Sequence, residues 1–321
     1  MKKLMMSILL GGLVLSGCAS GSASENSGSD KLHIVATVYP EYDWLKQITA
    51  GTEDRIEVTL LLDQGTDLHN YQPTAADMIK IAEADMFVYV GGESDAWVKD
   101  ALESSDNDQR IVVSLMDVLG NKAREEETVE GMEAEDEEEE EETEYDEHVW
   151  LSLQNAELFV DALKDACVQM DSEDSELFEK NAGAYKDKLN ELDEQYRSLC
   201  EKASVKTLLF ADRFPFLYLV KDYGLDYYAA FRGCSAESEA SFETVVFLAG
   251  KVDELSLPAI LTIESSDQKI AETVRDNTKK KDAEILVIDS MQSATKETID
   301  QGIGYLDIME KNLAVLERAL K

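Results

Sequence analysis

Residues 175–202 read SELFEKNAGAYKDKLNELDEQYRSLCEK, a long and highly charged stretch with the pattern of a single helix. Its larger apolar side chains recur near helical intervals, at Leu177, Tyr185, Leu189, Leu192, Tyr196 and Leu199. On both sides of this stretch, short β-rich runs alternate with helical segments. The pattern therefore predicts one long helix that connects two lobes of α/β structure.

The same alternation appears in each flanking half. Before the long helix we predict strands at 33–38, 55–62, 86–90 and 110–115, and helices at 43–49, 74–84, 95–103 and 153–170. After it we predict strands at 207–211, 226–231, 259–263 and 284–288, and helices at 214–223, 241–255, 267–278 and 304–320. Such alternation is typical of mostly parallel sheets covered by helices. The expected fold class is α/β, with two similar lobes at 32–173 and 204–321 joined by a rigid helix at 174–203.

The start of the chain carries a targeting signal. Residues 1–17 combine two lysines with an apolar run, at 5–15, that is too short to cross a bilayer as an ordinary helix. Residues 15–18, LSGC, resemble a bacterial lipobox, which implies cleavage before Cys18 and a lipid on its sulfur; the alternative is an ordinary secretory signal with a chance cysteine. Residues 18–31 read as a lipid-attached flexible tether. Since no later segment is apolar enough to span a bilayer, we expect a lipid-anchored protein on the extracytoplasmic face of the cell membrane.

The charge balance narrows the choice of partners. The 321 residues include 68 Asp and Glu against 30 Lys and Arg, for a formal net charge of −38. This acidity argues against nucleic acid or an anionic membrane surface as the main partner, because both select basic patches. Residues 125–147 alone contain sixteen Asp or Glu and no Lys or Arg, which predicts a disordered, solvated loop. Such a loop either gathers cations weakly or is an insertion with no role in transport.

Three cysteines remain beyond the signal. In an oxidising location Cys167 and Cys200 are the first pair to test for a disulfide, and two buried reduced thiols are an equally good interpretation. Because three is an odd number, one cysteine is expected to be free. If Cys167 pairs with Cys200, the free cysteine is Cys234.

Candidate ligands follow the predicted strands. In parallel α/β sheets, ligands bind beyond the carboxyl ends of the strands. His69, Asp212, Glu264 and Asp289 all lie there, and His148 stands at the end of the acidic segment. Two imidazoles with one or two carboxylates suit a divalent metal in a cleft between the lobes: zinc accepts mixed nitrogen and oxygen ligands, whereas manganese prefers more oxygen. The third histidine, His33, opens a strand and is expected to be structural or exposed.

Two segments carry a family resemblance. Residues 64–74, QGTDLHNYQPT, are similar to the "DPHxYxPT" segment of the cluster A-I substrate-binding proteins of zinc and manganese ABC importers. Residues 146–151, DEHVWL, resemble the "DPHVWLDP" segment of that family, with Glu147 in place of Pro and Ser152 in place of Asp. Residues 37–40 and 289–290 resemble its first strand-to-helix turn and its final Asp ligand. The resemblance implies His69, His148 and Asp289 as metal ligands.

The resemblance also implies a function. A monomeric lipoprotein of this kind captures Zn²⁺, or alternatively Mn²⁺, and delivers it to an ABC permease driven by a cytoplasmic ATPase. One departure stands out: the family's third ligand, His or Glu, falls here at Ala211, which cannot bind metal. Asp212, Glu264, or Glu237 or Glu239 in the loop 233–240 are the candidate replacements.

Other functions fit less well. Delivery of manganese or iron is the nearest alternative, and an oxygen-rich site would favour it. A zinc hydrolase would need an open metal position and a Glu base, but the chain has no HExxH motif and no Ser or Cys nucleophile motif, so we expect no enzyme. A surface adhesin with an incidental metal site is a third class.

Overall fold

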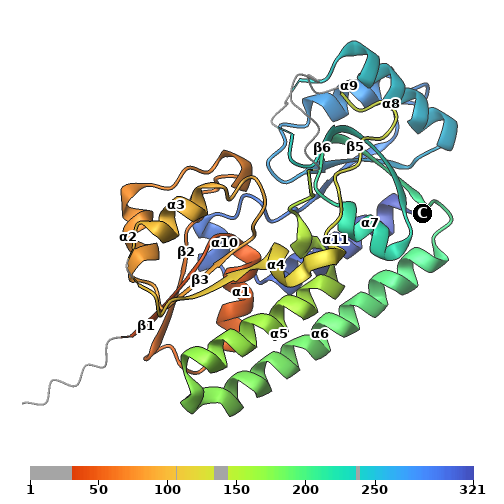
Figure 1. The fold of residues 1–321 in the computed structure, drawn as a ribbon. Helices are drawn as coiled ribbons and strands as arrows, with labels where there is room; N and C mark the ends of the chain where they lie inside the picture. The colour runs from red at the N-terminus through yellow and green to blue at the C-terminus, as the bar shows by residue number, and fades with distance from the viewer. Residues whose placement is uncertain (1–30, 106, 134–143, 236–238) are drawn as a thin grey trace, which may run out of the picture. The chain divides into compact units, whose positions relative to one another are not determined.

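The computed structural model describes residues 31–105, 107–133, 144–235 and 239–321 (Figure 1). The predicted signal peptide, Cys18, residues 134–143 of the acidic segment and Glu237 lie outside the described residues. Within the part that is described, every helix is too short or too polar to cross a membrane.

The first half of the chain forms a parallel sheet of four strands. These strands are β1 (Leu32–Ala36), β2 (Ile56–Leu60), β3 (Met86–Tyr89) and β4 (Ile111–Ser114), in the order β2-β1-β3-β4. The connecting helices are α1 (Tyr39–Ile48), α2 (Ala75–Glu83), α3 (Trp97–Glu103) and the short α4 (Leu115–Leu119). At α2 the Thr74 hydroxyl accepts a hydrogen bond from the Asp77 backbone N–H, as expected of an N-cap.

The second half repeats the arrangement. Its strands are β5 (Thr207–Phe214), β6 (Asp226–Arg232), β7 (Ala259–Ile263) and β8 (Glu284–Ile288), parallel and in the order β6-β5-β7-β8. The helices here are α7 (Leu217–Tyr223), α8 (Phe242–Leu255), α9 (Lys269–Asn277), α10 (Lys296–Asp300) and α11 (Tyr305–Ala319). Since the strand order is the same in both sheets, the prediction of two similar parallel α/β lobes is confirmed.

Two long helices lie between the sheets in the chain. α5 (Leu153–Met170) and the 28-residue α6 (Ser175–Lys202) are joined by the short 3-10 turn η4 (Ser172–Asp174) and run antiparallel (Figure 1). The hypothesis of a Cys167–Cys200 disulfide is wrong, because both thiols are free and buried. Cys167 lies near the turn between the helices, whereas Cys200 lies about 38 Å along α6, at 1.5 Å per residue. A disulfide requires Cα atoms within about 7 Å.

Strand β5 is longer than predicted. It runs to Phe214 rather than ending at 211, and its register with β6 shifts between Phe210 and Arg213. Ala211 and Asp212 fall in this irregularity, so Asp212 lies inside the strand and not beyond its end. The irregularity, a β-bulge, leaves a polar residue, Asp212, inside the strand. For this reason the residues after 211 resembled a loop in the sequence.

The described ends of the acidic segment are also different from the prediction. Glu125 and Tyr145 form an antiparallel bridge, and the Glu126 backbone N–H donates to the Glu144 carbonyl at 2.9 Å. The Arg232 guanidinium pairs with the Glu144 carboxylate at 2.8 Å and lies 3.7 Å from that of Glu126. Opposite charge and strand pairing therefore hold these ends, and a wholly disordered, solvated loop is wrong for residues 125–133 and 144–147.

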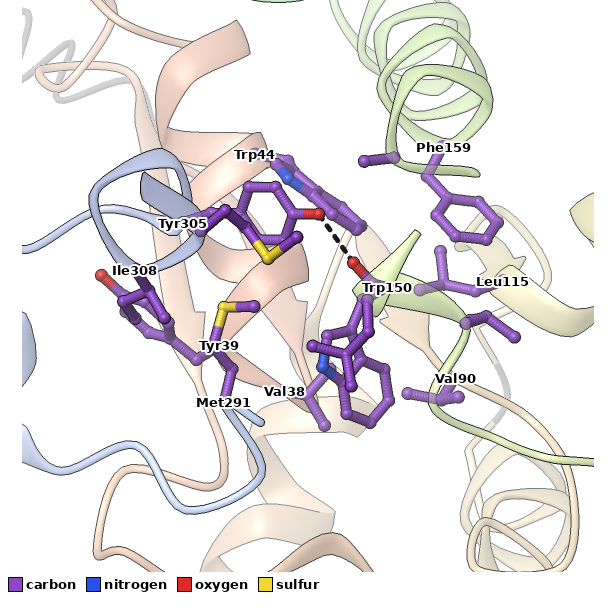
Figure 2. Packing of buried hydrophobic residues seen from close by; sticks show 14 of the residues in the cluster. Val38, Tyr39, Trp44, Val90, Leu115, Trp150, Phe159, Met291, Tyr305 and Ile308 are labelled. Atoms are coloured by element: carbon purple, nitrogen blue, oxygen red, sulfur yellow. Dashed lines mark hydrogen bonds between the residues drawn. The ribbon is translucent and has the colours of Figure 1, made fainter. Parts of the chain in front are cut away.

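A buried aromatic core connects the two halves of the chain (Figure 2). Trp150, in the 3-10 turn η3 (Val149–Leu151), is fully buried and donates from Nε1 to the Ser290 carbonyl at 2.8 Å. Its own carbonyl accepts a hydrogen bond from the Tyr305 hydroxyl at 2.7 Å. The Tyr305 ring in turn packs edge-on against Trp44, with ring centres 5.1 Å apart.

A fully buried carboxyl group caps the start of α1. One oxygen of Glu41 accepts hydrogen bonds from the Thr37 backbone N–H, the Thr37 hydroxyl and the Val38 backbone N–H, at 2.9, 3.1 and 3.2 Å. The other oxygen, Oε1, is buried without a partner. Burial, with a contribution from the charge of Asp95, raises the pKa of Glu41 to about 8. The folded protein therefore keeps this proton at neutral pH, whereas the unfolded chain loses it near pH 4.5.

This difference predicts that Glu41→Gln changes the pH dependence of stability. Because the folded-state pKa is raised, the Glu41 carboxyl lowers the free energy of unfolding progressively between pH 4.5 and 8. A neutral amide does not titrate. The free energy of unfolding of the Gln variant, relative to that of the wild type, should therefore rise by on the order of 3 kcal/mol from pH 5 to pH 8. Urea unfolding at both pH values measures the gain, with the exposed Glu173→Gln as control. An equal difference between Glu41→Gln and wild type at both pH values would contradict it.

Candidate metal centre

His69 lies in a short 3-10 turn, η1 (Leu68–Asn70), that follows β2. The Asp67 side chain caps this turn, accepting from the His69 backbone N–H at 3.1 Å. The second oxygen of Asp67 accepts from the Arg213 guanidinium at 2.5 Å. Burial acts to raise the pKa of Asp67, but the Arg213 charge and the hydrogen bonds from Arg213 and the His69 backbone N–H outweigh burial and lower it. An ion pair between the bulge of β5 and this turn therefore positions the His69 backbone, while the Nδ1 atom of its ring lies 2.7 Å from the Ser94 hydroxyl.

His148 directly precedes η3 and is fully buried. One Asp146 oxygen accepts both the His148 backbone N–H, at 2.7 Å, and the ring Nδ1, at 2.9 Å. The carboxylate thus holds the proton on Nδ1 and leaves the Nε2 lone pair free to bind a metal, as in many histidine–metal sites. The His148 ring also lies edge-on against Trp150, with centres 5.4 Å apart.

The two imidazoles face each other. The Nε2 atoms of His69 and His148 are 3.0 Å apart. Two nitrogen ligands of one tetrahedral zinc ion are about 3.3 Å apart, given Zn–N distances near 2.0–2.1 Å. The two ring nitrogens, from histidines 79 positions apart in the chain, therefore lie close to the spacing that one zinc ion requires.

Their surroundings set their charges. Burial, together with the neighbouring His148, lowers the pKa of His69 to about 3, so this ring is neutral at physiological pH. Burial acts in the same direction on His148, but the carboxylates of Asp146, Glu126 and Glu147 outweigh it and raise the pKa. A neutral His69 is in the form that binds a metal.

Cys234 lies next to this pair, two residues beyond β6. Among the described residues, His69, His148 and Cys234 form the one group of three His, Cys, Asp or Glu whose ligand atoms all lie within 4.8 Å of one another. Burial, reinforced by the Glu126 carboxylate, raises the pKa of the Cys234 thiol. Sequence reasoning missed this residue, although it follows a predicted strand as the other candidates do.

Gly233 allows the loop that carries Cys234 to approach the His148 ring. A Cβ atom at Gly233 would lie 2.9 Å from the Phe214 carbonyl and 3.1 Å from Cε1 of His148. On the other side of the site Gly92, with φ of +90°, leaves room for the Glu147 carboxylate, which a Cβ would meet at 2.3 Å. Both positions therefore require glycine for the site to close.

The acidic candidates lie outside the group of His69, His148 and Cys234. Asp289 accepts from the Met291 backbone N–H at 2.8 Å, and burial with the neighbouring Glu264 charge raises its pKa to about 6. Glu264 accepts from the Ser290 hydroxyl and backbone N–H, at 2.9 and 2.8 Å. Asp212 lines a separate cavity of about 710 Å³, together with Glu239.

Two other residues named from the sequence have structural roles. Ala211 is buried in a hydrophobic cluster of the second lobe, with Leu209 and Leu248. The half-exposed His33 faces Glu57 at 3.9 Å.

Gln292 contacts His148, and the sequence did not indicate this contact. Its Nε2 lies 2.6 Å from Nε2 of His148, and its Oε1 accepts from the Ser290 hydroxyl at 3.0 Å. The loop after β8, which holds Asp289, thus reaches the histidines through Gln292. A glutamine has no distinctive pattern in a single sequence, so no signal pointed to it.

A cavity of about 430 Å³ leads to the site. His69 and Cys234 line it together with four acidic side chains, Glu93, Glu126, Glu144 and Glu147. Glu147 comes within 3.6 Å of His69 Nδ1, and one of its oxygens is buried without a hydrogen-bond partner. Carboxylates gathered around the neutral His69 ring make this cavity attractive to cations.

Comparison with known proteins points to one family. Residues 34–319 match the model of the family described as "Zinc-uptake complex component A periplasmic". The chain is 33% identical over 315 residues to the "High-affinity zinc uptake system protein ZnuA" of Bacillus subtilis, covering 96% of this chain and 94% of that protein. It is 32% identical to the "Zinc-binding lipoprotein AdcA" of Streptococcus pneumoniae, where the match covers 92% of this chain but 57% of the relative.

A solved structure agrees with these relatives. The Zn(II)-bound ZnuA-like domain of Streptococcus pneumoniae AdcA superposes with a TM-score of 0.71 at 30% identity. The match covers 91% of this chain and 99% of that domain. The likeness therefore extends over both sheets.

Proposed function

The chain belongs to the zinc-uptake complex component A family, and from this membership we propose that it captures Zn²⁺ outside the cytoplasm and delivers the ion to an ABC importer. The observation that carries the proposal is the pair of Nε2 atoms 3.0 Å apart at the carboxyl edges of the sheets, in a cavity lined by carboxylates. The protein holds and hands over its cargo and performs no chemical turnover.

We assign His69 and His148 as zinc ligands. Asp146 orients the His148 ring, and the Ser94 hydroxyl contacts Nδ1 of the His69 ring. The loop after β8 supplies a further ligand. Asp289 is the residue that the family resemblance implies, and Gln292 is the one that touches His148.

The proposal also includes a membrane anchor and two partner proteins. A lipid on Cys18 would anchor the protein at the extracytoplasmic face of the membrane. The partners are a permease and its ATPase, which fits the name of the Bacillus subtilis relative as a protein of a zinc uptake system.

The nitrogen-rich centre favours zinc over manganese. Imidazole binds zinc well, whereas manganese prefers a harder, oxygen-rich set. We therefore expect metal-free protein, dialysed against equal Zn²⁺ and Mn²⁺, to retain one zinc and almost no manganese, as measured by elemental analysis. Retention of mainly manganese would move the proposal to a manganese importer, and retention of neither metal would overturn capture of metal altogether.

A further inference from the structure

We propose that Cys234 supplies a thiolate as the third ligand of the zinc ion held by His69 and His148. This inference rests on the proposed function and names the chemistry of its site. It answers the departure seen in the sequence, since the position that resembles the third ligand is Ala211, a buried side chain with no donor atom.

The geometry suits a single tetrahedral ion. Zinc binds sulfur at about 2.3 Å and imidazole nitrogen at about 2.0–2.1 Å, so neighbouring ligand atoms are roughly 3.3–3.6 Å apart. The Cys234 sulfur and one nitrogen of each histidine all lie within 4.8 Å of one another. A small movement of side chains brings three such atoms to one ion.

The backbone of the Cys234 loop is held in place. The Cys234 N–H donates to the Glu126 carboxylate at 3.0 Å, and Gly233 packs directly against the His148 ring. Arg232, one residue earlier, pairs with Glu144. These contacts direct the thiol to the histidines, whereas the other two cysteines in the described part of the chain lie in helices α5 and α6 and belong to no such group.

The charges favour a thiolate once metal is present. When Zn²⁺ binds, the S–H bond breaks, an S–Zn bond forms and the proton leaves to solvent; no electron is transferred. Two neutral imidazoles leave the ion with its full double charge, and one thiolate halves it. Carboxylates contact each of the three residues: Asp146 at His148, Glu147 near His69 and Glu126 at Cys234.

Cobalt replaces zinc in tetrahedral sites and reports its ligands by absorption. We expect the Co²⁺-loaded wild-type protein to show an intense near-ultraviolet thiolate-to-cobalt charge-transfer band beside the weaker visible bands. Cys234→Ser should lose the near-ultraviolet band, while Cys167→Ser and Cys200→Ser keep it. In competition with a zinc chelator, Cys234→Ser should weaken Zn²⁺ binding by roughly 100-fold or more, a larger loss than an outer residue gives. Cys234→His, which restores a nitrogen ligand, should regain affinity without the charge-transfer band.

The outcomes separate the two proposals. Visible cobalt bands without a thiolate band in the wild type, or a thiolate band that survives Cys234→Ser, would overturn the role of Cys234 and leave zinc capture standing. A wild-type protein that binds neither Co²⁺ nor Zn²⁺ would overturn both. If Cys234→Ser fails to fold, a thiolate band that persists in both Cys167→Ser and Cys200→Ser still assigns the sulfur to Cys234, and its loss in either of them overturns the assignment.

Discussion

We expect His148→Ala to lower the affinity for Zn²⁺ by roughly two orders of magnitude or more, because it removes a proposed ligand and also leaves the Asp146 carboxylate without its ring partner. A smaller loss, about 10- to 100-fold, is expected for Asp146→Asn, which keeps the ligand but weakens its orientation. Titration of metal-free protein with Zn²⁺ against a chromophoric chelator measures both losses. Thermal unfolding adds a second readout, since a bound ion stabilises only the folded state.

Two matched variants make this result specific. His69→Ala removes the second proposed ligand, and we expect it to abolish the zinc-dependent rise in melting temperature as we expect of His148→Ala. His33→Ala removes a half-exposed ring at the start of β1 and should leave the affinity unchanged. Loss of binding in His33→Ala with retention in the other two variants would overturn the assignment.

Much of the fold was predictable because several strands are apolar runs, and β7, for example, is buried along its whole length. The runs at 207–211, 259–263 and 284–288 are almost continuously apolar and all became strands. The helix α6 was predicted with its bounds unchanged, since its pattern extends over many turns. The short helices α4 and α10, five residues each, were missed because so few residues carry no detectable period.

The site was predictable only in part. The rule that ligands gather at the carboxyl ends of parallel strands selected His69, and the family resemblance joined it to His148. The rule failed at Asp212, because the bulge of β5 places a polar residue inside a strand. It also applied to Cys234, but a sulfur in an odd set of three cysteines was considered only for disulfide pairing. No local pattern indicates that Gln292 touches His148, since that contact depends on how the two halves of the chain pack together.

That packing depends strongly on Trp150. The side chain is fully buried and lies among the residues of the aromatic core (Figure 2). Its indole N–H donates to the Ser290 carbonyl, in the loop after β8. Trp150→Ala leaves a large cavity and an unpaired carbonyl, so we expect the free energy of unfolding to fall by about 3–5 kcal/mol. Urea unfolding of the metal-free protein measures this loss without any contribution from zinc.

Trp150→Phe divides the loss into its two causes. Phenylalanine keeps most of the ring volume but cannot donate to Ser290, so its cost should be nearer the 1–3 kcal/mol of a buried group left without a partner. Ser290 also contacts Glu264 and Gln292, and Gln292 contacts His148. Loosening Ser290 should therefore weaken Zn²⁺ binding in the Phe variant more than a stability change alone would, because the ligands themselves lose their support. If Trp150→Phe proved as unstable as Trp150→Ala, the hydrogen bond rather than the ring would hold the two halves together; if it bound zinc as the wild type does, the loop after β8 would have no part in the site.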